Sequence, residues 1–211
     1  MVLASFRTPQ RWRRTRAAAL KTGALLLALT ACSGESAPER PAADPTAEST
    51  PLTDYDTSDL TLVRGDFCDR VTEGAIAAAL GDDSTDEQAW QPGTRLPRSR
   101  DLSNEFGCSW SSGAVSATAW VFAPPVTAPR ATDFAREVVG KECERLETAP
   151  DLGAPSVAQH CGKGADLTGF HGLVGDAWVG CEISGLPVAG GDDTSRVGEW
   201  CVAVLEALRT A

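Results

Sequence analysis

The sequence predicts a single α+β domain in which helices pack on one face of an antiparallel sheet and disulfide bonds brace the fold. Three observations support this prediction. Residues 63–211 have the length of one ordinary domain. Their apolar periodicity changes in the order helix, hairpin, helix, strands, helix, which is typical of α+β proteins. The same residues contain six cysteines, an even number.

Three helices are expected in this domain. The first covers residues 72–80, where Thr72 can serve as N-cap and Gly81 as the C-terminal stop. The second covers residues 132–146, and its spacing directs Cys143 inward. The third shows the strongest periodicity, because helical spacing joins Val197, Trp200, Cys201, Val204, Leu205 and Leu208. Cys201 is therefore expected in the core.

Five strands are expected, at residues 106–111, 115–122, 172–174, 177–183 and 186–188. Ser112-Gly113 separates the first two and predicts a hairpin turn. Alternation over residues 115–122 assigns side chains to two faces. One face carries Ser116, Thr118, Trp120 and Phe122, and the other carries Val115, Ala117, Ala119 and Val121.

The first 31 residues have the layout of a secretory signal peptide. Six basic residues and no acidic residue accompany a short apolar stretch at residues 24–31. The stretch ends in Leu29-Thr30-Ala31-Cys32, which resembles the lipobox of bacterial lipoproteins. In that class the cysteine is acylated and becomes the new N-terminus, so the resemblance implies that Cys32 holds the chain in the lipid bilayer at the outer face of the cytoplasmic membrane. An ordinary signal peptide is the alternative, and Arg13-Arg14 leaves Sec and twin-arginine export both open.

Residues 32–62 are expected to form a disordered tether, since they are rich in Pro, Ser, Thr, Ala and acids and lack apolar periodicity. The whole chain has 19 basic and 29 acidic residues, and removing residues 1–31 takes away six basic ones. The mature chain then has 13 against 29, a net charge of −16. Such a charge disfavours nucleic acid as a partner. It favours solubility and spacing from an anionic envelope, with attraction of a cationic partner as the functional alternative.

The remaining cysteines are Cys68, Cys108, Cys143, Cys161, Cys181 and Cys201. An even set in an exported domain predicts three disulfides, for which fifteen connectivities exist. A metal site is disfavoured because the sequence contains no Cys-x-x-Cys pair. Sequential pairing, Cys68 to Cys108, Cys143 to Cys161 and Cys181 to Cys201, is our hypothesis.

Three stretches resemble a known family: Phe67-Cys68-Asp69-Arg70-Val71-Thr72 leading to Ala78-Ala79-Leu80-Gly81, then Cys108-Ser109-Trp110, then Gly172-Leu173-Val174-Gly175-Asp176-Ala177. Together they are similar to the actinobacterial lipoprotein family of unknown function whose domain opens with a Cys-Asp-Leu-Leu-type helix. The resemblance covers most of residues 66–211 and implies the Cys68–Cys108 pair. It brings no catalytic residue with it. The four further cysteines and a short, Gly-rich final strand region at residues 185–192 depart from the family pattern and leave the strand order of the second half open.

Motifs for chemistry are absent from the sequence. It contains no Gly-x-Ser-x-Gly elbow, P-loop or His-Glu-x-x-His, and we expect no cofactor and no metal site. His160 and His171 lie in a Gly-rich region and are expected to be exposed loop residues, although a Ser/His/Asp set with Asp166 or Asp176 stays open. The acidic residues 82–87 lack EF-hand spacing and are expected to form a solvated turn.

Trp90 is the one aromatic residue expected in a polar loop, at residues 88–93. Exposed tryptophans can anchor sugars or partner proteins, and Arg95, Arg98 and Arg100 follow in the same loop. A tryptophan folded back on the core is the alternative.

The sequence thus predicts a lipid-anchored, non-catalytic binding module of the cell envelope. Its expected functional surface is the loop at residues 82–101 or the sheet face without helices. The alternative is an envelope hydrolase with an unrecognised site, which requires His160 or His171 to meet a serine and a carboxylate in a cleft.

Overall fold

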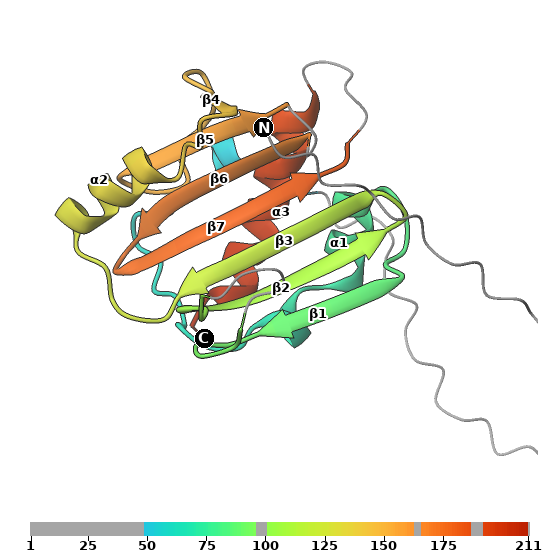
Figure 1. The fold of residues 1–211 in the computed structure, drawn as a ribbon, viewed down its shortest axis with the longest axis horizontal. Helices are drawn as coiled ribbons and strands as arrows, with labels where there is room; N and C mark the ends of the chain where they lie inside the picture. The colour runs from blue at the N-terminus through green and yellow to red at the C-terminus, as the bar shows by residue number, and fades with distance from the viewer. Residues whose placement is uncertain (1–48, 96–100, 163–165, 187–191, 211) are drawn as a thin grey trace, which may run out of the picture. The chain divides into compact units, whose positions relative to one another are not determined.

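The computed structural model describes residues 49–95, 101–162, 166–186 and 192–210. In these ranges seven strands form one antiparallel sheet with the order β1-β2-β3-β7-β6-β5-β4 (Figure 1). The strands are β1 (Asp86–Trp90), β2 (Glu105–Ser112), β3 (Val115–Phe122), β4 (Cys143–Arg145), β5 (Ser156–Cys161), β6 (Leu167–Val174) and β7 (Ala177–Ser184). The α-helices are α1 (Glu73–Leu80), α2 (Ala128–Glu137) and α3 (Asp192–Leu208), and η1 (Leu52–Asp54) and η2 (Cys68–Arg70) are short 3₁₀ turns. The disulfide-braced α+β class is confirmed.

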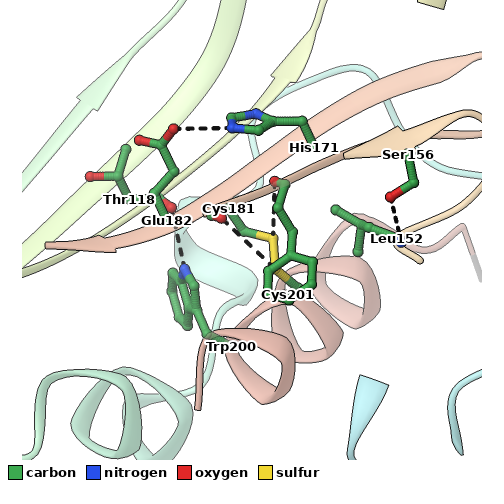
Figure 2. Close-up of a disulfide and its surroundings, with 9 residues drawn as sticks. Thr118, Leu152, Ser156, His171, Cys181, Glu182, Trp200 and Cys201 are labelled. Carbon is green, nitrogen blue, oxygen red and sulfur yellow. Dashed lines mark hydrogen bonds and ion pairs between the residues drawn. A yellow bond between two sulfur atoms is a disulfide. The ribbon is translucent and has the colours of Figure 1, made fainter. Parts of the chain in front are cut away.

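The main core lies between one face of the sheet and the two helices α1 and α3, which run behind the sheet in Figure 1. The alternation expected in β3 is correct, because Ala117, Ala119 and Val121 face this core and are fully buried. Trp110 and Trp200 meet edge to face there, with their ring centroids 5.5 Å apart. The indole Nε1 of Trp200 also donates to the backbone oxygen of Thr118 at 3.2 Å, which ties α3 to β3 (Figure 2).

The caps expected for α1 are present. The side chain of Thr72 accepts a hydrogen bond from the amide of Ala75 at 3.2 Å. Gly81 adopts the left-handed conformation, with φ of 79°, and its amide donates to the oxygen of Ala77. These local contacts fix both ends of the helix.

The prediction of a helix over residues 132–146 is wrong in its bounds, and Cys143 does not lie on a helix. The helix begins at Ala128, with a proline in its first turn, and ends at Glu137. Cys143 starts the edge strand β4 and is half-buried, opposite Cys161 on β5. Strand pairing and a disulfide, both non-local, override the helical spacing of the sequence here. α2 packs against the other face of the sheet, where Val126, Ala131, Ala135, Val157, Leu173 and Trp178 form a second, smaller core.

The three disulfides join the cysteines in sequential order. Cys68–Cys108 ties η2 to β2, Cys143–Cys161 ties β4 to β5, and Cys181–Cys201 ties β7 to α3. Cys201 is fully buried, as its helical position predicts. The second and third pairs therefore link elements that also pack together.

Several elements differ from the sequence-based expectations. Strands β1, β4 and β5 were not expected, and β6 begins at Leu167 rather than at residue 172. Leu186 lies outside any strand, and the rest of the strand expected at residues 186–188 falls outside the described residues. No helix in the described ranges is long and apolar enough to cross a membrane.

Residues 49–62, which were expected to belong to the tether, pack on the domain. Leu52 and Leu62 are 4% and 6% exposed and join the main core. The hydroxyl of Tyr55 donates to Oε1 of Glu206 on α3 at 2.5 Å. The apolar residues in an otherwise polar segment provide the burial that orders it. The folded domain therefore starts before residue 63.

Candidate functional site

One face of the sheet, the one opposite α1 and α3, carries a row of aromatic and glycine residues; we call it the open face. The strand register places Trp90, Gly107, Trp120, Gly180 and His171 side by side across β1, β2, β3, β7 and β6. Aromatic residues and glycines alternate along this row. Each tryptophan thus has a glycine beside it on the next strand.

The glycines of this row make room for the indoles. A Cβ atom at Gly107 would lie 2.2 Å from Cζ2 of Trp90, and one at Gly180 would lie 2.4 Å from Cε2 of Trp120. Any side chain at these two positions would therefore displace a ring. The rings lie across the neighbouring strand and cover its backbone, while both tryptophans remain half-buried. The row forms a preformed aromatic surface.

A buried polar cluster continues the row on β6. His171 is 1% exposed, and its Nε2 lies 3.3 Å from Oε1 of Glu182 (Figure 2). The same Nε2 lies 3.2 Å from Nε2 of Gln159. Nδ1 of His171 and Oε1 of Gln159 are buried without a hydrogen-bond partner. The His171 ring also lies 5.6 Å from that of Trp120, centroid to centroid. The imidazole is thus held by a carboxylate, an amide and an indole.

The histidines were expected in exposed loops, and that expectation is wrong. His160 lies on β5 and His171 on β6, since the Gly-rich sequence around them forms strands rather than a connection. His160 Nδ1 contacts Oγ1 of Thr168 at 3.0 Å. Among the described residues no hydrogen bond joins either histidine to a serine, and Asp176 pairs with Arg64 instead. The described residues therefore assemble a His–carboxylate pair without a nucleophile.

A small cavity opens on the open face, between the sheet and α2; we call it the aromatic pocket. Its volume is about 220 Å³, and its lining consists of Glu105, Trp120, Phe122, Phe134, Glu137, Val138 and Trp178. Alternation along β3 directs Trp120 and Phe122 to this face, and α2 brings Phe134 over them. The Phe134 ring lies 5.5 Å from that of Phe122 and 5.7 Å from that of Trp178. The rings hold one another in place around the pocket.

The charges at the aromatic pocket are negative. Glu105 and Glu137 belong to its lining, and no described basic residue does. The hydroxyl of Ser103 holds Oε2 of Glu105 at 3.2 Å. Arg130 lies outside the lining, with its guanidinium 4.2 Å from the centroid of the Phe134 ring and 3.9 Å from a carboxylate oxygen of Glu137. The pocket thus combines aromatic faces with carboxylates.

A larger groove of about 420 Å³ lies between α1 and α3. Its lining includes the small side chains Ala75, Ala78 and Ala203, and also Ser49 and Thr50 at the start of the described chain. The chain itself therefore enters this groove, which makes it a weaker candidate for a ligand.

The other residues singled out in the sequence have different outcomes. Trp90 ends the edge strand β1 rather than lying in a loop, and its Nε1 is buried without a partner. Arg95 is exposed and forms a β-bridge with Leu102. Cys32, Arg98 and Arg100 lie outside the described residues.

The acidic stretch expected as a solvated turn partly belongs to β1. Asp86 and Glu87 are exposed strand residues, while Asp82 and Asp83 precede the strand. In the described ranges no group of three His, Cys, Asp or Glu side chains is placed to hold a metal ion.

The sequence alone did not predict the aromatic pocket as a site. One signal pointed to it, because the alternation over residues 115–122 already placed Trp120 and Phe122 on the same face as Ser116 and Thr118. Large aromatic residues on an otherwise polar strand face indicate a packing partner or a ligand. The partner, α2, could not be placed from the sequence.

Known proteins give no further guide to this site. No family model, curated protein or solved structure matched the chain when each of these was compared with it.

Proposed function

We propose that this protein is a lipid-anchored lipoprotein of the cell envelope, and that its domain binds a small ligand in the aromatic pocket without catalysing a reaction. The observation that carries the binding role is the pocket itself. Four aromatic side chains surround a cavity on the sheet face that α1 and α3 leave uncovered. Concave sites lined by aromatic residues with a few polar groups are typical ligand sites.

The anchoring part of the proposal rests on the sequence. Basic residues, a short apolar stretch and the lipobox-like Leu29-Thr30-Ala31-Cys32 follow in the order found in lipoprotein precursors. Two acyl chains anchor a protein stably, at about 0.8 kcal/mol per buried CH₂ group. The resemblance of residues 66–211 to an actinobacterial lipoprotein family, together with three disulfides, agrees with export.

A binding role is favoured over a hydrolase because the histidine cluster lacks a nucleophile. His171 has Glu182 as an orienting carboxylate, but the described residues place no serine within hydrogen-bond distance of the ring. The ring is also 1% exposed, so a substrate has no access to it. A structural role for the cluster explains both facts.

The anchor is tested by metabolic labelling with radioactive palmitate, comparing wild type with Cys32→Ala. Wild type should incorporate label and sediment with membranes. The variant should stay unlabelled, as unprocessed precursor or as released protein. Equal labelling of both forms, or equal release of both into the medium, would contradict the lipoprotein assignment.

The binding site is tested by a fragment screen with protein NMR, using residues 32–211 with Cys32→Ser so that no acyl chain is added. Ligands should shift the indole N–H signals of Trp120 and Trp178 and leave that of Trp110, buried on the opposite face, unchanged. Ligands that shift only the signals of residues in the groove between α1 and α3, or a screen without any bound ligand, would contradict the proposed site.

A further inference from the structure

The chemistry of the aromatic pocket selects for one sign of charge. The faces of aromatic rings carry the negative part of their quadrupole, so they attract a cation placed over them. Trp178 is 3% exposed, and Trp120, Phe122 and Phe134 are half-buried, so the rings present a largely dehydrated lining. Dehydration strengthens the attraction of a cation to a ring.

The two carboxylates of the lining add to this preference from two different elements. Glu105 begins β2 and Glu137 ends α2, so the sheet and the helix each contribute one negative charge. An anion entering the pocket would meet both of them. The net charge of the mature chain, −16 after loss of residues 1–31, acts in the same direction at longer range.

The chain already holds one cation against this ring cluster. The guanidinium of Arg130 stacks over Phe134 at 4.2 Å and lies near Glu137. Its side chain is 53% exposed and does not line the pocket, so it does not fill it. Phe134 and Glu137 also line the pocket, so the two groups that hold Arg130 outside border the cavity as well.

The size of the pocket limits the ligand to a small head group. Its volume of about 220 Å³ is below the range of roughly 300–1,000 Å³ that is usual for drug-sized ligands. A methylated ammonium group with a short tail fits such a volume. A whole oligosaccharide or a nucleotide does not.

Resting on the proposed function, we propose that the aromatic pocket binds an organic cation, a methylated or protonated alkylammonium group. The rings hold its methyl or methylene groups, and Glu105 and Glu137 neutralise its charge. A free alkylammonium molecule and the head group of a choline lipid share this chemistry.

The test compares two ligands of nearly the same shape and different charge: choline and its neutral analogue 3,3-dimethylbutan-1-ol. Isothermal titration uses residues 32–211 with Cys32→Ser, at low salt. Choline should bind about tenfold or more tightly than the alcohol, since the rings contact both ligands but the negative ring faces and the carboxylates attract only the charged one. Vesicles of phosphatidylcholine form a third arm, and binding of free choline or of the vesicles identifies the source of the head group.

Variants separate the contribution of the pocket carboxylates to choline affinity from that of the overall negative charge of the protein. Glu105→Gln combined with Glu137→Gln should reduce choline affinity about tenfold and leave the alcohol unaffected. Glu87→Gln is the control. Glu87 is exposed and lies opposite Trp110 in the strand pairing, so it faces the side of the sheet away from the pocket. Its replacement should have little effect on choline affinity. Phe134→Leu keeps apolar volume but removes a π face, and should also weaken choline.

Two results would overturn the inference. Equal affinity for choline and the alcohol would mean that the pocket recognises apolar shape alone, which leaves the proposed binding function intact. Absence of binding by choline and by the vesicles in wild type would remove the cation inference, while the fragment screen decides separately whether the pocket binds any ligand.

Discussion

The contact between Gly180 and Trp120 gives the sharpest test of the open face. In Gly180→Ala the new Cβ would lie 2.4 Å from two carbons of the Trp120 ring and 2.8 Å from its nitrogen. Ordinary contacts begin near 3.4 Å, so the indole must move outward by about 1 Å. Overpacking of this kind costs about 1–3 kcal/mol, and the higher strand preference of alanine offsets about 0.5–1 kcal/mol. We expect a net loss of about 0–2.5 kcal/mol.

Urea unfolding monitored by circular dichroism measures this loss with disulfides intact. Gly74→Ala in α1 is the matched control, because its Cβ would meet no atom within 4 Å. The control should be neutral or more stable by up to about 1 kcal/mol. If the variant also moves Trp120, choline affinity should fall in Gly180→Ala and not in the control. A Gly180→Ala protein as stable as the control, with unchanged affinity, would refute the packing of Trp120 over the glycine.

Two further predictions concern the ordered segment 49–62 and the disulfides. Burial raises the pKa of Tyr55, and its hydrogen bond to Glu206 raises it further. Tyr55 is the single tyrosine of the chain, so its ionisation can be followed by ultraviolet absorbance. We expect it to titrate well above pH 10 in the folded protein and near pH 10 in urea. Because the folded state holds the phenol proton more tightly, the stabilisation of the fold by Tyr55 is complete below pH 10 and is lost as the pH rises further. Tyr55→Phe should remove this pH dependence. Titration of Tyr55 near pH 10 in the folded protein would contradict its contact with Glu206. Replacing Cys143 and Cys161 by alanine opens a loop of 18 residues and should lower the free energy of unfolding in urea by about 3 kcal/mol. The same change at the fully buried Cys181 and Cys201 should lower it more, because it also leaves a cavity. Equal losses for the two pairs would contradict their difference in burial.

Elements specified by neighbouring residues could be predicted from the sequence. The N-cap Thr72 and the C-terminal Gly81 directly flank the helix α1, and the turn between β2 and β3 lies between the strands it joins. The face of α3 that contains Cys201 follows from spacing along one helix. In each case the signal and the structure occupy the same short stretch of chain.

Elements specified by distant residues could not be predicted in the same way. β1 reads Asp-Glu-Gln-Ala-Trp and is almost wholly exposed, so nothing in its own pattern indicates a strand; its pairing with β2 does. Cys143 has helical spacing with the residues before it, yet its disulfide partner is on β5. The aromatic pocket needs Phe134 of α2 to reach Phe122 on β3 and Trp178 on β7, and that placement depends on contacts far apart in sequence.

Trp120 connects the two parts of the open face, and this has a consequence for ligand binding. Its indole lies over Gly180, its ring neighbours that of the buried His171, and it lines the aromatic pocket. A ligand that binds beside Trp120 therefore contacts a ring whose position is already fixed by a strand and by the histidine cluster. Little conformational entropy remains for the ligand to remove, which favours affinity in a small pocket. The buried pairing of His171 with Glu182 lies beside Trp120 on the same face, so it holds one side of the ring in place.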